Sequence, residues 1–255
     1  MKKMLEICAL ASGSNGNCYY IGNEKDALLI DAGISCRQIF SRIYQKGLEL
    51  TKLKAIFISH EHSDHIRGAR VIAKKLKIPV FITSKTYFAT YNNLKPDYPV
   101  FFEPGNKINV GQFNIYSFLK NHDAANPCSF RVEYEGKNIG VFTDIGEPCD
   151  NVKLHIEKCD ALFLETNYDA NMLWNGKYPF FLKQRIASGQ GHLSNKQAYD
   201  LLNNHAGKIL QCVFLSHLSR ENNTPETAFK EIQPLETRFA IKLTSRYEAA
   251  ELYQL

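Results

Sequence analysis

The most constraining feature of the sequence is the polar run His-Glu-His-Ser-Asp-His at 60–65, which directly follows the apolar, strand-like segment 54–59. In an extended chain, His60 and His62 project to the same side, and a turn would bring the aspartate and the third histidine beside them. Imidazole and carboxylate are the usual protein ligands of zinc and its first-row neighbours. The run therefore predicts two adjacent sets of metal ligands at the end of a strand.

Further candidate ligands follow strand-like segments elsewhere in the chain. Six of the eight histidines lie at the ends of such segments or in short polar loops: His60, His62, His65, His122, His192 and His217. The other two, His155 and His205, fall within or at the end of expected helices, where a solvated role is the default. Asp144 also ends a strand-like segment and would place a carboxylate where both sets could share it. These residues predict a centre for two divalent metal ions, zinc or manganese.

Composition narrows the class of protein. At 255 residues, with 44% hydrophobic and 22% charged residues, the chain is expected to form one domain over 1–255. Lys2 and Lys3 are followed by Glu6 and the polar stretch 12–17, and no apolar run reaches membrane-spanning length, so we expect a cytoplasmic protein without membrane contact. Seven scattered cysteines without a Cys-x-x-Cys pair are typical of reduced thiols. The net charge of +5 permits a nucleic-acid partner without demanding one, and no obligate protein partner is inferred.

Short apolar segments alternate with amphipathic patterns and hairpin signals. The expected strands are 7–10, 18–21, 27–30, 54–59, 80–82, 98–103, 106–118, 131–134, 138–142, 161–164, 208–215 and 239–243. The expected helices are 35–45, 66–76, 84–92, 148–158, 194–204 and one that begins at 224, with helical insertions within 168–191. Neither a purely parallel sheet nor a purely antiparallel sandwich fits this order. We expect an α/β (α+β) fold of two mixed sheets packed together, with helices outside and the last strand closing the sheet.

The order of these residues resembles the ligand pattern of the metallo-β-lactamase superfamily over essentially the whole chain. The matching positions are Asp31, His60-x-His62-x-Asp64-His65, His122, Asp144 and His217. The resemblance implies a four-layer αββα sandwich that holds two metal ions. It assigns His60, His62 and His122 to one ion, Asp64, His65 and His217 to the other, and Asp144 to a bridge between them. Asp31 is expected to orient the histidine loop without binding metal.

Branches of the superfamily differ around these ligands. Flavodiiron proteins carry Glu where this chain has His62, so the imidazole favours hydrolysis over redox chemistry. True β-lactamases lack the bridging carboxylate of Asp144, and the segment between Asp144 and His217 is too short for the cap domain of β-CASP nucleases. Glyoxalase-like thioester hydrolases share the ligands but do not explain Glu165 in Leu-Glu-Thr-Asn and His192 in Gly-His-Leu-Ser. That pair resembles the proton-relay residues of tRNase Z and related phosphodiesterases.

Within the nucleases, the chain resembles the YycJ (WalJ) family, whose members are described as 5′-to-3′ double-strand DNA exonucleases. The shared segments are Ala-Ser-Gly-Ser-Asn-Gly-Asn at 11–17, Phe-Leu-Lys-Gln-Arg-Ile at 181–186 and His-Leu-Ser-Arg-Glu-Asn at 217–222. The resemblance implies a metal-dependent phosphodiesterase that attacks double-stranded DNA ends with a metal-bound hydroxide. A hydrolase of a small ester, thioester or lactone, or an RNA-processing nuclease, remains the alternative.

Roles for individual residues follow from these expectations. The expected catalytic residues are Asp64, Glu165 and His192. The expected substrate-binding residues are Ser14, Asn15, Asn17, Ser194, Asn195 and Arg220. The Gly- and Ser-containing loop at 12–17, together with Arg220, is expected to hold a terminal 5′-phosphate through backbone amides and the guanidinium. The basic residues Lys177, Lys183, Arg185 and Lys196 are interleaved with aromatics, a combination that could grip further phosphates and stack a frayed base. For each lysine taken alone, a solvated role is the default, and Arg220, beside a candidate ligand, is the stronger candidate.

Overall fold

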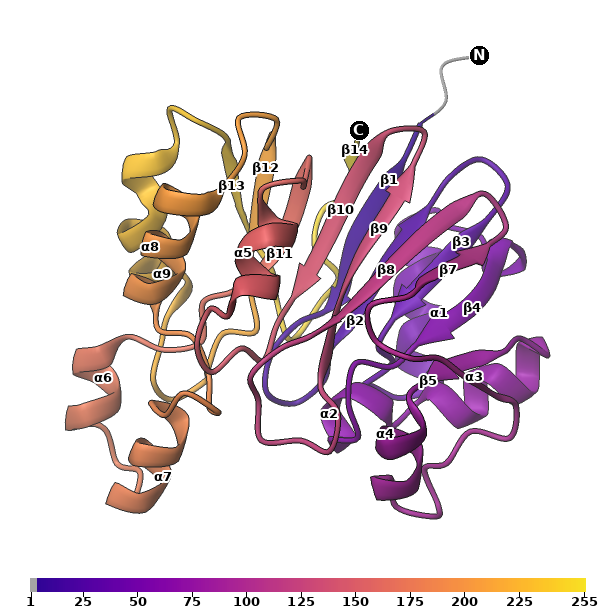
Figure 1. Cartoon of the computed structure of the whole chain (residues 1–255), viewed down its shortest axis with the longest axis horizontal. Helices are drawn as coiled ribbons and strands as arrows, with labels where there is room; N and C mark the ends of the chain where they lie inside the picture. Colours follow the sequence, from indigo (N-terminus) through magenta and orange to yellow (C-terminus); the bar gives the residue numbers. More distant parts are fainter. Residues whose placement is uncertain (1–3) are drawn as a thin grey trace.

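Two mixed sheets form the centre of the protein in the computed structural model, which describes residues 4–255 (Figure 1). Lys2 and Lys3 lie outside the described residues. In the order of the strands across it, the first sheet comprises β14 (Tyr253–Gln254), β1 (Glu6–Ala11), β2 (Cys18–Gly22), β3 (Ala27–Ile30), β4 (Leu53–Phe57), β5 (Val80–Ile82) and β6 (Pro99–Phe101). The second comprises β13 (Ala240–Leu243), β12 (Cys212–Ser216), β11 (Ala161–Glu165), β10 (Lys137–Phe142), β9 (Cys128–Tyr134), β8 (Phe113–Leu119) and β7 (Lys107–Val110).

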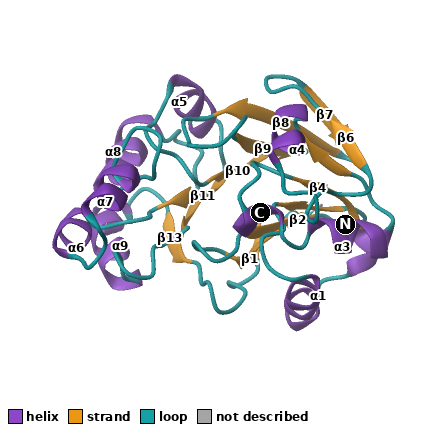
Figure 2. Cartoon of the chain, turned by 90° about the horizontal axis from the view of Figure 1, so that it is seen from below, coloured by secondary structure: helices purple, strands orange, loops and turns teal. Residues whose placement is uncertain are grey.

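Helices cover the outer faces of both sheets (Figure 2). Those that follow strands of the first sheet are α1 (Cys36–Gln45), α2 (Ser63–Ile66), α3 (Ala69–Leu76) and α4 (Ser84–Ala89). Those of the second half are α5 (Asp150–Ile156), α6 (Ala170–Asn175), α7 (Phe180–Ile186), α8 (Asn195–His205) and α9 (Pro225–Ile232). Two short 3₁₀ turns lie at Leu50–Lys52 and Gln233–Leu235. Capping boxes start α1 at Ser35 and α8 at Ser194, as the sequence predicted. No helix among residues 4–255 is long and apolar enough to cross a bilayer.

Successive side chains of each strand point to opposite faces of its sheet, and the buried ones form three hydrophobic clusters. In β2, Tyr19 faces the other sheet, where it contacts Phe163 at a ring-centroid distance of 4.9 Å, whereas Tyr20 faces the helices of its own sheet. A third cluster fills the space between the second sheet and α5, α8 and α9. Both faces of each sheet are therefore buried, and the expected αββα sandwich is confirmed.

Several expected boundaries were wrong. The segment 106–118 is a hairpin of β7 and β8, because Gly111 takes a left-handed φ of 55° that reverses the chain. The helix expected at 66–76 begins at Ala69 as α3, because Ile66 ends a separate short helix, α2. Strand β12 begins at Cys212, four residues later than expected. Strand β13 closes the second sheet at its edge, as predicted, whereas β14 was not predicted.

Candidate metal centre and active site

The candidate ligands gather at one edge of the two sheets. Strands β3 and β4 run parallel, as do β10, β11 and β12, so within each group the carboxyl ends lie side by side. In chain order, Asp31 follows β3, His60 and His62 follow β4, Asp64 and His65 lie in α2, His122 lies between β8 and β9, Asp144 follows β10, Glu165 ends β11 and His217 follows β12. Residues far apart in the sequence therefore meet where strands end, the usual position of sites in sheets with parallel strands.

The backbone turns sharply at three of these strand ends. Asp31, Asp144 and His217 have φ values of 59°, 55° and 56°, in the left-handed region that residues other than glycine rarely adopt. Such strained positions concentrate at functional sites, where surrounding contacts hold them in place. Here the turn directs each side chain back towards the other ligands instead of along the strand.

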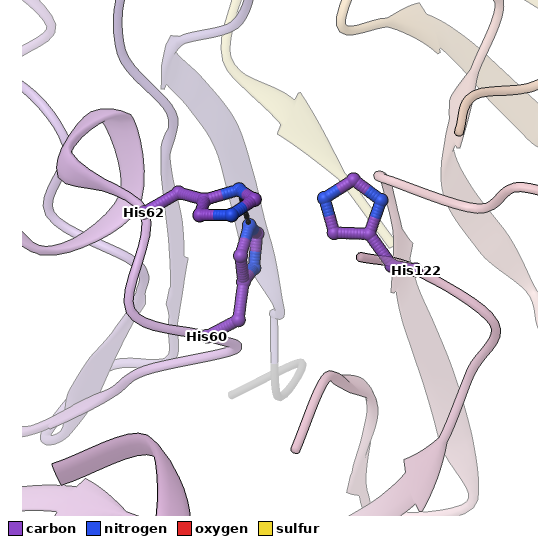
Figure 3. Close-up of side chains that lie close together, drawn as sticks. All are labelled: His60, His62 and His122. Carbon is purple, nitrogen blue, oxygen red and sulfur yellow. Dashed lines mark hydrogen bonds between the residues drawn. The ribbon is translucent and has the colours of Figure 1, made fainter. Parts of the chain in front are cut away.

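The first triad of ligands consists of His60, His62 and His122, whose candidate ligand atoms all lie within 4.8 Å of one another. Figure 3 shows His60 and His62 projecting from one segment and His122 from another towards the same point. The His60 Nε2 atom lies 3.1 Å from Nδ1 of His62, and the two rings are nearly perpendicular, at 77°. Nitrogens that converge in this way suit a single small cation.

The second triad consists of Asp64, His65 and His217, also within 4.8 Å of one another. Asp144 lies between the triads. Its Oδ2 is 3.2 Å from Nε2 of His65, and its Oδ1 is 3.4 Å from Nε2 of His217 and 3.9 Å from Nε2 of His122. The carboxylate therefore reaches both triads, which is the geometry of a bridging ligand.

Hydrogen bonds fix which nitrogen of the imidazoles faces the centre. Asp31 Oδ2 lies 2.7 Å from Nδ1 of His65, and the carbonyl of Gly191 lies 3.0 Å from Nδ1 of His122. Because both acceptors need the proton on Nδ1, they leave a lone pair on Nε2. Asp31 also accepts bonds from the backbone and hydroxyl of Ser59, each at 2.8 Å, so it links Ser59 to His65 across the histidine run.

Buried atoms without partners test whether these residues fit a metal. Among the described residues, His122 Nε2, His217 Nε2 and Asp144 Oδ2 are buried and have no hydrogen-bond partner. Burying such groups without a partner is costly, and native structures rarely retain it unless another species completes the site. All three are lone-pair donors directed at the same centre. The residues present therefore fit divalent cations at both triads.

At His60, His122 and the two aspartates, electrostatics favour the protonation states that bind metal. Burial lowers the pKa of His60 well below its usual value and that of His122 to about 4, so both imidazoles are neutral near pH 7. Burial alone would raise the pKa of Asp64 and of Asp144, but neighbouring histidines lower both below their usual range. Neutral imidazoles and ionised carboxylates are the forms that coordinate divalent ions.

The carboxylates also make the second triad a favourable place for positive charge. Burial opposes protonation of His217, yet the carboxylates of Asp144, Asp64 and Glu165 raise the pKa of this imidazole to about 10. The field that stabilises a proton on His217 is the field that would stabilise a cation beside it.

Glu165 and His192 form a second functional unit beside the ligands. Glu165 is fully buried, and its Oε1 accepts hydrogen bonds from Nδ1 of His192 at 2.7 Å and Nδ1 of His217 at 3.0 Å. Its Oε2 accepts from the backbone amides of Ile145 at 2.6 Å and Leu193 at 3.2 Å. Burial would raise the pKa of Glu165, but the charge and hydrogen bond of His192 and those of His217 lower it to about 2. The carboxylate is therefore ionised and binds both imidazoles.

A cavity of about 230 Å³ opens over this unit and the ligands. The residues that line it include His62, Asp64, Asp144, His192 and His217. Tyr178 and Arg185 contribute to its wall, and Arg185 Nε is held 2.6 Å from Asp123 Oδ2. A substrate in the cavity would therefore reach both the ligands and His192.

The expected substrate-binding residues divide into two groups. Ser14 lines the cavity, and Asn15 is exposed next to it. The other four do not line the cavity. Asn195 is buried and bonded to Asn223, and Ser194 caps α8. Arg220 is exposed, lies near Glu221 and lines an adjoining pocket of about 370 Å³ that also contains Arg246.

Asn17 and the loop at 12–17 contact the candidate ligand Asp64 through hydrogen bonds. The Asn17 side-chain amide lies 3.4 Å from Asp64 Oδ2, and its backbone amide donates to the Asp64 carbonyl at 2.8 Å. The amides of Ser12, Gly13 and Gly16 also donate within the protein. The expectation that these amides bind an anion was wrong for these four positions, because the amides donate within the loop, to α2 and to the carbonyl of Ser245.

Three polar residues of the site were not predicted from the sequence. Lys120 is buried, and its Nζ donates to the carbonyl of Thr143 at 2.6 Å, directly before the bridging residue. Asn167 lines the cavity and donates to the backbone carbonyl of His217 at 2.8 Å. Asp123 pairs with Arg185. Asn167 ends the Leu-Glu-Thr-Asn segment that identified Glu165, so its position beside a strand end was the available signal.

Comparison with known proteins places the chain in a family. The model of the metallo-beta-lactamase superfamily matches residues 11–172. The exodeoxyribonuclease YycJ of Bacillus anthracis is 34% identical over 227 residues, covering 88% of this chain and 86% of that protein. The exodeoxyribonuclease WalJ of Streptococcus pneumoniae is 37% identical over 224 residues, covering 86% of this chain and 83% of that protein.

A solved structure agrees with the fold. The metallo-beta-lactamase fold protein YhfI from Bacillus subtilis is similar with a TM-score of 0.75 at 18% identity, over 100% of both chains. The family model covers more than half of the described sequence, and both curated relatives match nearly all of it. The chain is therefore a metal-dependent hydrolase that belongs to the metallo-β-lactamase superfamily and, within it, to the family of the YycJ and WalJ exodeoxyribonucleases.

Proposed function

We propose that this protein is a cytoplasmic nuclease that uses two divalent ions, zinc or manganese, to degrade double-stranded DNA from a 5′ end. The observation that carries the proposal is the Glu165–His192 pair beside two bridged ligand triads. A thioester hydrolase needs the ligands but gains little from a carboxylate–histidine pair, because a thiolate leaves without a proton donor. A phosphodiester has a poor alkoxide leaving group and does need a proton donor. The names of the YycJ and WalJ relatives support DNA as the substrate.

Each residue has a role in this proposal. The six side chains of the triads and Asp144 would hold the ions, which would lower the pKa of a water molecule and stabilise negative charge on the phosphoryl oxygens. Because Nδ1 of His192 binds Glu165, Nε2 is the ring atom left for substrate. His192 would deliver a proton from Nε2 to the leaving 3′ oxygen. Glu165 would keep the ring in this orientation and stabilise its positive charge.

The adjoining pocket supports recognition of a terminal phosphate. Arg220 and Arg246 line it together with Ser12, and Ser219 lines both this pocket and the cavity over the ligands. Two guanidinium groups and hydroxyls suit a phosphate dianion. In this proposal a 5′-phosphate binds Arg220 and Arg246 while the scissile phosphate lies at the ligands. The Arg220 side chain, and not the amides of the 12–17 loop, then provides the expected end recognition.

End-labelled substrates test the proposal directly. Protein saturated with zinc or manganese is incubated with 5′-phosphorylated linear duplex, the same duplex with 5′-hydroxyl ends, closed circular DNA, RNA and a small thioester at fixed salt. We expect nucleotides to be released from the phosphorylated 5′ end, with little nicking of the circle. Turnover of the thioester alone would overturn the proposal, and preferred turnover of RNA would favour an RNA-processing nuclease.

Arginine variants separate end recognition from general attraction. Arg220→Ala should lower kcat/KM on phosphorylated ends by about tenfold or more, the size of one charged hydrogen bond, and have less effect on hydroxyl ends. Arg37→Ala is a matched control, because Arg37 is an exposed arginine on α1. Equal losses in the two variants, or equal use of the two ends by the wild type, would refute the phosphate pocket.

A further inference from the structure

The segment 170–186, which we call the aromatic arm, carries α6 and α7 away from the sheets (Figure 1). Helix α7 has the sequence Phe-Phe-Leu-Lys-Gln-Arg-Ile, and none of its residues is buried. Most helices of a globular protein bury an apolar stripe against the core. An apolar helix whose residues all stay at least partly exposed has a surface left for a partner.

Three large aromatic side chains are exposed on the arm. Trp174 is 44% exposed, Phe180 66% and Phe181 71%. The rings of Trp174 and Phe180 lie near each other, with centroids 6.2 Å apart and planes at 45°. Single exposed apolar residues are ordinary, but adjacent aromatic rings on one short segment mark an interaction surface.

The charge of the arm selects the class of partner. Between residues 170 and 186 there are two lysines and one arginine but no aspartate or glutamate. Lys183 is fixed along the arm, where its Nζ donates to the carbonyl of Trp174 at 2.8 Å. A surface of aromatic rings with only positive charges matches the bases and phosphates of single-stranded nucleic acid. The same charges disfavour docking against a second copy of the arm.

The arm continues into the catalytic cavity. Tyr178, Leu182 and Arg185 line that cavity, and Arg185 is anchored to Asp123 beside the ligand His122. A strand whose scissile phosphate lies at the ligands would therefore meet the arm on leaving the cavity. In an intact duplex, the bases face the opposite strand and are not free to stack on protein rings.

We propose that the aromatic arm stacks unpaired bases of the strand being cut, so that the enzyme acts on a locally melted end of the duplex. The inference rests on the proposed nuclease function and names the form of DNA that the site takes. Phe180 and Phe181 contribute the most exposed rings, and Trp174 supports them. Duplex ends that fray easily are then better substrates than stable ends of the same length.

Trp174 offers a direct reporter, because it is the only tryptophan in the chain. Wild-type protein is titrated with a nuclease-resistant phosphorothioate single strand at fixed salt, while Trp174 fluorescence and the anisotropy of a dye on the oligonucleotide are followed together. We expect the fluorescence to be quenched with the same midpoint as the anisotropy change. The Phe180→Ala, Phe181→Ala double variant should bind about 5- to 150-fold more weakly for each stacked base lost, at 1.36 kcal/mol per factor of ten. Tyr44→Ala on α1 is the control, because Tyr44 is a comparably exposed aromatic (67%) elsewhere on the surface.

Cleavage assays complete the test. The wild type should cut a duplex with mismatched terminal pairs faster than a fully paired one, and the double variant should lose most of this preference. Binding or cleavage of DNA without a change in Trp174 fluorescence would overturn the inference but leave the nuclease proposal standing. Absence of both binding and cleavage would refute the proposed function. Quenching that depends on protein concentration alone, with a doubled molecular mass, would show that a second copy covers the arm and would also overturn it.

Discussion

Replacing Glu165 by glutamine should damage both metal binding and catalysis, for a reason that lies in its four hydrogen bonds. One carboxylate oxygen accepts from Nδ1 of His192 and of His217, and the other accepts from two backbone amides. Glutamine has one oxygen and one NH₂ group. If the NH₂ faces the amides, two buried donors lose their acceptor; if it faces the imidazoles, both Nδ1 atoms must become acceptors.

The second arrangement moves the proton of His217 to Nε2. That atom is the nitrogen that His217 offers to the second triad, 3.4 Å from the bridging Asp144, and an N–H cannot bind a cation. Loss of a supporting hydrogen bond of this kind typically weakens metal binding about 10- to 100-fold. His192 would also lose its orientation, and a misplaced general acid costs about 100- to 10,000-fold in rate.

Two variants measured together test this reasoning. Metal affinity is obtained by competition with a chelator, and kcat on labelled DNA is measured across metal concentrations. His192→Ala should lose rate but keep wild-type affinity for both ions, because His192 lies outside the triads. Glu165→Gln should lose affinity for one ion and remain slow at saturating metal. A Glu165→Gln protein with wild-type affinity and wild-type rate would refute the assigned roles of the carboxylate.

Three further predictions concern the ions and the scaffold. At saturating zinc or manganese the wild type should hold two ions per chain. The His122→Ala and His217→Ala variants should each hold one ion. Elemental analysis that finds at most one ion in the wild type would contradict the two triads. Gly33→Ala should lower the free energy of unfolding by about 3 kcal/mol and weaken metal binding, because a Cβ there would lie 1.5 Å from a backbone oxygen of α2. Denaturant titration measures the change in stability. Burial and a neighbouring arginine lower the pKa of His155 from 6.5 to about 4. The unfolded state therefore takes up a proton at a higher pH than the folded state, so the free energy of unfolding falls as the pH drops below 6.5. Because His155 is only partly buried, solvent screening reduces the effect. Wild type should still lose more stability than His155→Phe between pH 7.5 and 5, and parallel stability curves would exclude this.

The sequence predicted those parts of the site that depend on local pattern. His60 and His62 alternate in an extended chain, and Asp144 and His217 end apolar segments, so their residue types and positions were visible without the fold. Parallel pairing of β10, β11 and β12 then brings the strand ends together. The sequence indicated this arrangement only through its resemblance to the metallo-β-lactamase superfamily. Contacts between distant segments were not visible. Nothing in the order of residues shows that the Asn17 backbone amide is already bonded to Asp64.

Helix boundaries and the surroundings of the surface arginines could not be predicted, because both depend on contacts between distant segments. Gly68 has ordinary φ, but a Cβ there would lie 2.3 Å from the carbonyl of Ile34, so close packing with a distant loop, and not local propensity, sets the break between α2 and α3. Arg220 follows a ligand in sequence, yet the chain turns after His217 and carries the guanidinium into the pocket that it shares with Arg246. Proximity in sequence is therefore a poor guide to proximity in the site once a strand has ended.

The left-handed residues connect the strain of the fold with the chemistry of the site. Asp31, Asp144 and His217 each adopt a backbone conformation that costs about 1–3 kcal/mol for a residue with a side chain. Glycine would relieve that strain at each position, but it would remove the carboxylate that holds His65, the carboxylate that reaches both triads, and a candidate ligand of the second triad. The strain is retained because a strand that continued straight would carry these side chains past the centre. The sharp turn at each of these strand ends thus allows side chains from parallel strands to converge on one centre.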